Sequence, residues 1–133
     1  MRISASVHNS ATAHAATVQS GDARQTVAIP AKTSGRGSAV NGGELLMLAL
    51  ATCYCNDLFR EATRLGIAID TVEVEASADF AGVGLAARDI RYRASVESPA
   101  GADAVGRLLR ETDAVAEIHN TVRTGVPVVL VTA

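Results

Sequence analysis

The stretch GGELLMLALATCYCNDLFREATRLG, residues 42–66, decides the fold of this chain and contains its only two cysteines, Cys53 and Cys55. It is apolar on all sides from Leu45 to Cys55 and amphipathic afterwards, which predicts a helix that enters the core and emerges at its far end. Gly66 suits the C-terminal cap of such a helix. Because a helix that is apolar all round needs cover on every side, we also expect a homodimer.

The two cysteines have different neighbours on this helix. Two residues turn a side chain through about 200°, so Cys53 and Cys55 face opposite sides and cannot form a disulfide or a two-thiolate metal clamp. Cys55 shares a face with Leu58 and Phe59, where a thiol acts as a small buried hydrophobe. Cys55 is therefore predicted to be a structural residue.

Cys53 lies where the apolar face turns polar, and its polar neighbours are Asn56, Asp57 and Arg60. A reactive thiol needs partial access and a positive neighbour that lowers its pKa. Arg60 lies two turns away, roughly 10 Å along the axis, and Asp57 works against a thiolate. Spacing alone leaves two interpretations open, a reactive Cys53 or a buried structural one.

The remaining ionisable residues form no recognisable catalytic or metal-binding pattern. His8 and His14 fall in predicted strands and His119 in a short helical stretch, without the spacing of metal ligands. We expect no metal and no cofactor, and we expect each histidine at the surface or in a hydrogen bond. Glu44 opens the long helix, where a carboxylate interacts favourably with the helix dipole.

The pattern of the rest of the chain predicts one α+β domain over residues 1–133, a mainly antiparallel sheet packed around the long buried helix. Alternation and turn residues predict strands at 2–7, 14–19, 25–29, 72–80, 90–96 and, in VPVVLV, 126–131. The acidic outer face of 72–80 is expected opposite the basic outer face of 90–96. Helical stretches are predicted at 105–112 and 114–122.

Composition excludes several classes of partner. A net charge of −2, 3% aromatic residues and no tryptophan give no basic patch or stacking platform for nucleic acid or an anionic membrane. The longest apolar run, Leu45 to Cys55, is shorter than the roughly 20 residues that span a bilayer. With no signal-peptide pattern at the N-terminus, we expect a cytoplasmic protein.

The run GGELLMLALATCYCNDL resembles the helix of the OsmC/Ohr superfamily, the osmotically inducible protein C and organic hydroperoxide resistance proteins. In that family an N-P-E-E-L-like start leads through an alanine- and leucine-rich stretch to a cysteine, which Cys53 matches. The predicted order of elements is similar over nearly the whole chain. The resemblance implies an OsmC-like fold, an intertwined homodimer with the central helices between the sheets, and a thiol peroxidase that acts on organic hydroperoxides.

The chain departs from the family pattern at the second cysteine. Active members carry it in a C-P-[VI]-S-x-[TA]-L-like segment, which AEIHNTV, residues 116–122, matches with Ala116 in place of cysteine and Glu117 in place of proline. The family's catalytic glutamate is matched by Gly43 or Glu44. Its activating arginine comes from the loop before the helix, where Arg36 or Arg24 could supply it.

The resemblance therefore gives Cys53, Glu44 and Arg36 as catalytic candidates, with Asn56, Arg60 and His119 as binding candidates. Two functions stay open. One is a one-cysteine, peroxiredoxin-like hydroperoxide reductase whose sulfenic acid is recycled by an external thiol. The other is a non-peroxidase OsmC-like protein that binds a small apolar or thiol-bearing molecule in a degenerate site, which the missing cysteine favours.

Overall fold

The computed structural model describes residues 1–132 and divides the chain into two compact units, Met1–Leu45 and a second that begins at Leu46. The first unit is an antiparallel meander of β1 (Ile3–Asn9), β2 (His14–Ser20) and β3 (Ala23–Val27). The meander that the sequence predicts is thus confirmed. Ala16 is its one buried apolar residue among the described positions. That residues 1–133 form a single domain stays a prediction.

The helix α1 (Gly42–Leu65) begins with a reciprocal cap. The Oδ1 atom of Asn41 accepts the backbone N–H of Glu44 at 2.9 Å, and the Oε2 atom of Glu44 accepts the N–H of Asn41 at 2.8 Å. This capping box satisfies two backbone donors that an open helix end leaves unpaired. Glu44 therefore has a structural role at the start of α1.

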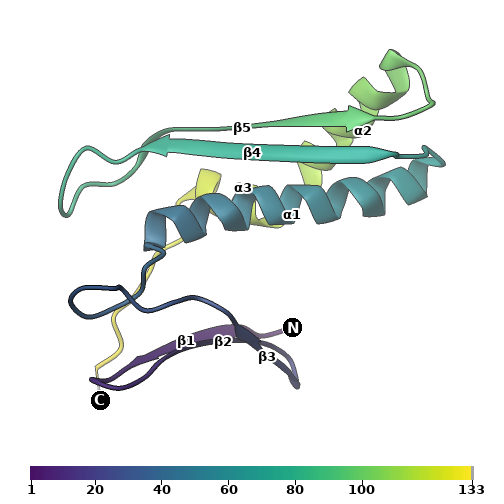
Figure 1. Cartoon of the computed structure of the whole chain (residues 1–133). Coiled ribbons are helices and arrows are strands. Elements are labelled where there is room, and N and C mark those ends of the chain that lie inside the picture. Colours follow the sequence, from purple (N-terminus) through teal and green to yellow (C-terminus); the bar gives the residue numbers. More distant parts are fainter. Residues whose placement is uncertain (133) are drawn as a thin grey trace. The chain divides into compact units, whose positions relative to one another are not determined.

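The second unit contains most of α1, the hairpin β4 (Thr71–Asp79) and β5 (Arg88–Glu97), and the helices α2 (Ala102–Val115) and α3 (Glu117–Thr124). Figure 1 shows α1 running along one face of the hairpin. Alternate strand residues pack against the buried core of α1 and α2, as the period of two predicts. This core contains Tyr54, Leu58, Ala62, Leu108 and Ala116, with Val72, Val74, Tyr92, Ala94 and Val96 packed against it.

The outer face of the hairpin confirms the predicted charge pairing. Glu75 lies opposite Arg93 in the ladder, and the Nε atom of Arg93 lies 2.6 Å from the Oε2 atom of Glu75. Both side chains are more than half exposed, so this ion pair contributes little to stability. Its effect is on register, because the pairing favours this alignment of the two strands.

The second helical stretch, predicted at 114–122, is confirmed as α3, which ends before Gly125. Its predicted start is wrong, because the chain bends at Ala116 and the residues before the bend belong to α2. Ala116 has extended backbone angles and is fully buried. Burial of this small side chain holds the corner against the core. The bend brings the first turn of α3 against the middle of α1, which positions the candidate site.

Two predictions differ from the structure of this chain: the burial of the first half of α1 and the strand at 126–131. The first half of α1 is not covered on all sides, since Leu50 is buried while Leu48 is 60% exposed. Residues 126–132 are in no strand, because no neighbouring strand pairs with them, and Val128 is 99% exposed. Cover of these apolar residues by a second copy stays a prediction. No helix within residues 1–132 is long and apolar enough to cross a membrane.

Candidate functional site

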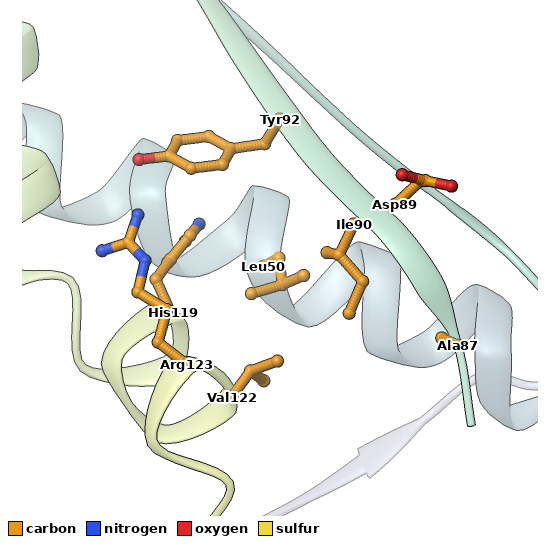
Figure 2. Close-up of a pocket in the computed structure, with 8 residues that line it drawn as sticks. All are labelled: Leu50, Ala87, Asp89, Ile90, Tyr92, His119, Val122 and Arg123. Atoms are coloured by element: carbon orange, nitrogen blue, oxygen red, sulfur yellow. The ribbon is translucent and has the colours of Figure 1, made fainter.

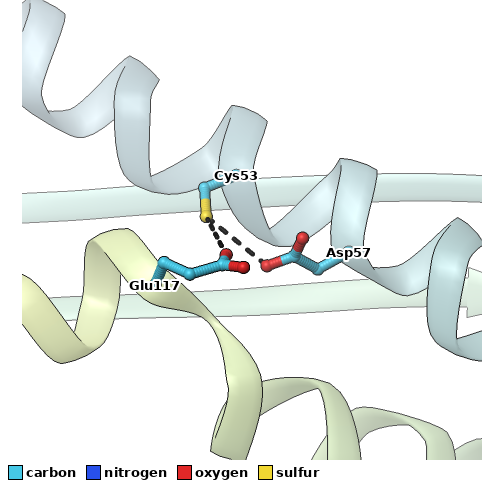
Figure 3. A group of neighbouring side chains, drawn as sticks. All are labelled: Cys53, Asp57 and Glu117. Atoms are coloured by element: carbon cyan, nitrogen blue, oxygen red, sulfur yellow. Dashed lines mark hydrogen bonds between the residues drawn. The ribbon is translucent and has the colours of Figure 1, made fainter. Parts of the chain in front are cut away.

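Cys53 lies between two carboxyl groups that come from different helices (Figure 3). The Cys53 thiol donates to the Oδ2 atom of Asp57 at 3.5 Å, because residues four apart lie on the same face of a helix. It also lies 3.9 Å from the Oε2 atom of Glu117, the first residue of α3. We call Cys53, Asp57 and Glu117 the thiol cluster.

Arg60 binds the carboxyl groups of the thiol cluster. Its Nη1 atom lies 2.9 Å from the Oδ1 atom of Asp57 and 3.6 Å from the Oε1 atom of Glu117. The predicted binding residue Arg60 therefore belongs to the site. It contacts the two carboxyl groups and not the sulfur. Its positive charge balances part of the negative charge that would otherwise surround the thiol.

The surroundings keep the Cys53 thiol protonated at neutral pH. Burial raises the pKa of Cys53, and the neighbouring charge of Asp57 raises it further, whereas the backbone N–H of Ile118 opposes both. Burial also raises the pKa of Asp57, although the Cys53 thiol and Arg60 act in the opposite direction. The sulfur thus needs a proton acceptor before it can act as a nucleophile.

The thiol cluster also has the composition of a metal-binding group. One ligand atom from each of its three residues lies within 4.8 Å of the others, and sulfur with carboxylate oxygen is a donor set that Zn²⁺ accepts. However, Arg60 already occupies the second oxygen of both carboxyl groups. The charge of the two carboxyl groups is therefore partly neutralised by Arg60, as a metal ion would otherwise do. The absence of a metal stays a prediction.

The other predicted site residues have separate surroundings. Arg36 donates from Nε to the Oδ1 atom of Asn9 at 2.8 Å within the first unit, and Glu44 caps α1. Asn56 is exposed on α1. Roles of Arg36, Glu44 and Asn56 toward Cys53 stay predictions.

Cys55 and His119 correct two expectations. Both cysteines are free, which agrees with the predicted absence of a disulfide, but Cys55 is half-buried and its neighbour Phe59 is 49% exposed. Cys55 is therefore not sealed in the core of this chain. His119 is 3% exposed and neither ring nitrogen has a hydrogen-bond partner among the described residues. The expectation of a surface or hydrogen-bonded histidine is wrong because the ring packs into an aromatic cluster.

The contact of Glu117 with Cys53 is the part of the site that sequence reasoning missed. The spacing of Cys53 and Asp57 was visible as one helical turn, but nothing local brings Glu117 to the same point. The only signal for Glu117 was its position where the resembled family has proline. The bend at Ala116 turns that position into a contact with Cys53.

Comparison with known proteins shows the family. A family model described as OsmC-like protein matches residues 35–131. The chain belongs to this OsmC-like family. No curated protein matches the sequence.

Solved structures show the same fold. An OsmC-like protein from Mycoplasma pneumoniae is 20% identical, with 92% of this chain and 86% of that chain covered and a TM-score of 0.62. An organic hydroperoxide resistance protein OsmC from Legionella pneumophila is 17% identical, with 92% and 90% covered and a TM-score of 0.61. An OsmC-like protein of unknown function from Vibrio cholerae is 13% identical, with 91% and 93% covered and a TM-score of 0.59. The TM-scores and the high coverage of both chains show that this chain has the α+β OsmC-like fold.

Proposed function

We propose that this protein reduces organic hydroperoxides through the single cysteine Cys53. The observation that carries the proposal is the position of the Cys53 thiol, which donates to Asp57 at 3.5 Å and lies 3.9 Å from Glu117, while Arg60 pairs with both carboxyl groups. A thiol with an adjacent base and a third group that holds the base has the arrangement of an activated nucleophile. Membership in the OsmC-like family and the fold shared with hydroperoxide resistance proteins support the same function.

The thiol cluster can supply both proton transfers of this reaction. As the Cys53 sulfur attacks the terminal oxygen of the hydroperoxide, the thiol proton passes to Asp57. The oxygen–oxygen bond breaks, the sulfur is oxidised to a sulfenic acid, and the alkoxide that leaves takes the proton from Asp57 to become an alcohol. Arg60 holds the Asp57 carboxyl group in place at 2.9 Å throughout.

Recycling needs two external thiols, because Ala116 stands where the resembled family has its second cysteine. The first thiol attacks the sulfenic acid, so that a mixed disulfide forms and water leaves. The second thiol attacks the mixed disulfide, which returns Cys53 to the thiol and releases the oxidised reductant. A small thiol, thioredoxin or a lipoyl group could fill this role.

A peroxide-consumption assay tests the proposal. Cumene hydroperoxide is followed in the presence of a small thiol, thioredoxin or a lipoyl reductant, with wild type, Cys53→Ser and Cys55→Ser. We expect turnover by wild type and Cys55→Ser and loss of turnover in Cys53→Ser. Because both cysteines are free and half-buried, Cys55→Ser is a matched control for general thiol reactivity.

A second candidate is a non-peroxidase OsmC-like protein that binds a small molecule in a degenerate site. It is favoured by the raised pKa of Cys53, which burial and Asp57 cause, and by the missing cysteine at Ala116. If wild type consumes peroxide no faster than Cys53→Ser with every reductant, the peroxidase proposal fails and this second candidate replaces it.

A further inference from the structure

The second unit contains a cavity of about 360 Å³ between β5, α1 and α3 (Figure 2). This volume lies near the lower end of the roughly 300–1,000 Å³ that small-molecule sites occupy. Leu50 of α1, Ile90 of β5 and Val122 of α3 line the cavity and give it apolar walls. No residue of the thiol cluster lines it. Its lining residues are Leu50, Ala87, Asp89, Ile90, Tyr92, His119, Val122 and Arg123.

His119 is the unusual residue of this cavity. Its side chain lines the space although the residue is only 3% exposed, and both Nδ1 and Nε2 have no partner among the described residues. Buried polar atoms in native proteins are nearly always hydrogen-bonded, because removing them from water without a partner is unfavourable. An imidazole with two unpaired nitrogens at the wall of a cavity indicates a missing partner.

The neighbouring side chains cannot supply that partner. The ring of His119 lies 4.4 Å from the ring of Tyr92 and 5.7 Å from that of Tyr54, measured between centroids, so aromatic packing fixes its position. The Tyr54 hydroxyl donates to the carbonyl of Leu109 at 2.7 Å, and the Tyr92 hydroxyl donates to Asp113. Both tyrosine hydroxyl groups are therefore used elsewhere.

The charges at the cavity favour an uncharged ligand. Burial lowers the pKa of His119, and the positive charge of Arg123 lowers it further, so the imidazole is neutral at pH 7. The Arg123 guanidinium is itself held by Asp113 at 2.6 Å. A neutral imidazole offers one N–H donor and one acceptor nitrogen, and a hydroxyl group can pair with either. The two charged residues that line the cavity, Asp89 and Arg123, have opposite signs, so the lining has no net charge that favours an ion.

We propose that this cavity is a binding site for a small uncharged molecule with an apolar body and one hydroxyl group, which bonds His119. The apolar body lies against Leu50, Ile90 and Val122. The hydroxyl group gives the imidazole the partner that none of residues 1–132 supplies. The site is independent of the proposed peroxidase reaction, because it uses none of Cys53, Asp57 or Glu117.

Tyrosine fluorescence reports directly on this site, since the chain has two tyrosines and no tryptophan and both tyrosine rings contact His119. The probe is cyclohexanol, compared with cyclohexanecarboxylate and cyclohexylamine, which carry the same ring and a charge at pH 7. We expect a saturable signal with cyclohexanol and weaker binding of both charged compounds. NMR of the ring nitrogens of His119 checks that the imidazole shifts with the same saturation.

Two variants and two controls locate the binding. His119→Phe keeps a ring but removes the hydrogen bond, and should weaken cyclohexanol binding about 2- to 10-fold. Val122→Phe fills the cavity from a half-buried position and should abolish binding without any change at His119. His8→Phe, at an exposed strand residue, and Cys53→Ser should bind as wild type does.

The proposal is overturned by any of three results. These are no saturable signal with cyclohexanol, equal binding of the charged compounds, or unchanged binding by Val122→Phe. Loss of peroxide turnover with intact cyclohexanol binding would leave this site standing and remove only the peroxidase function.

Discussion

Substitution of Asp57 by asparagine removes the negative charge 3.5 Å from the Cys53 sulfur while it keeps the shape of the side chain. Two unit charges about 4 Å apart interact by about 1 kcal/mol in water and about 4 kcal/mol at an effective dielectric constant of 20. We use the lower end, because Arg60 already balances part of this charge and Cys53 is partly exposed. About 1 kcal/mol corresponds to roughly fivefold more thiolate at a fixed pH.

Two reagents then separate the charge of Asp57 from its role in proton transfer. Alkylation by iodoacetamide releases iodide, which needs no proton. Alkylation should become about two- to threefold faster in Asp57→Asn. The gain is smaller than the roughly fivefold gain in thiolate, because a more stable thiolate is a weaker nucleophile. Oxidation by cumene hydroperoxide releases an alkoxide that needs a proton. In Asp57→Asn, the ratio of the oxidation rate to the alkylation rate should fall at least about tenfold, because Asp57 no longer acts as the general acid that protonates the alkoxide.

The assay measures both rates at Cys53 by quenching and peptide mass at one pH, in wild type, Asp57→Asn and the control Thr52→Ala. Thr52 is exposed on α1 and is none of the candidate site residues, so its variant should leave both rates unchanged. If the two rates of Asp57→Asn change by the same factor, Asp57 affects only the charge of the thiolate and the proposed proton transfer is refuted.

Three further predictions concern stability and assembly. His119→Phe should raise the free energy of unfolding at pH 7 by about 1 kcal/mol or more, because two unpaired nitrogens leave the interior. Burial lowers the pKa of His119 below its ordinary 6.5, so the unfolded state binds the proton more readily than the folded state. The stability of wild type should therefore fall more than that of His119→Phe as the pH drops below about 6.5. Urea unfolding of wild type and His119→Phe at pH 7 and pH 5 measures the stability difference and its pH dependence. Leu58→Ala, at a fully buried position, should lower the free energy of unfolding by about 2–5 kcal/mol, whereas Val83→Ala in an exposed loop should not change it. Light scattering should find a homodimer that Leu48→Glu weakens, and a wild-type monomer across the micromolar range would contradict this.

Local patterns predicted the elements that local chemistry determines. Alternating residues predicted the hairpin with its acidic outer face opposite its basic one, and the apolar run with Gly66 after it predicted α1 nearly to its ends. In the site, helical spacing placed Asp57 beside Cys53, whereas Arg60 reaches the thiol cluster through Asp57.

What the sequence did not predict depends on packing between distant segments. The bend at Ala116 and the contact of Glu117 with Cys53 arise from the way α2 and α3 close on the core. The burial of His119 depends on two aromatic rings from α1 and β5. The strand expected at residues 126–131 failed for a related reason, because a strand exists only where a neighbour pairs with it.

Mass spectrometry of the protein after treatment with cumene hydroperoxide tests the central claim most directly. Without added thiol, the account predicts that oxygen is added at Cys53 while Cys55 stays a thiol, and with a small thiol it predicts a mixed disulfide at Cys53 alone. Cys53→Ser should show neither product, and Cys55→Ser should show both. Equal oxidation of the two cysteines, or none until the protein is denatured, would contradict the account.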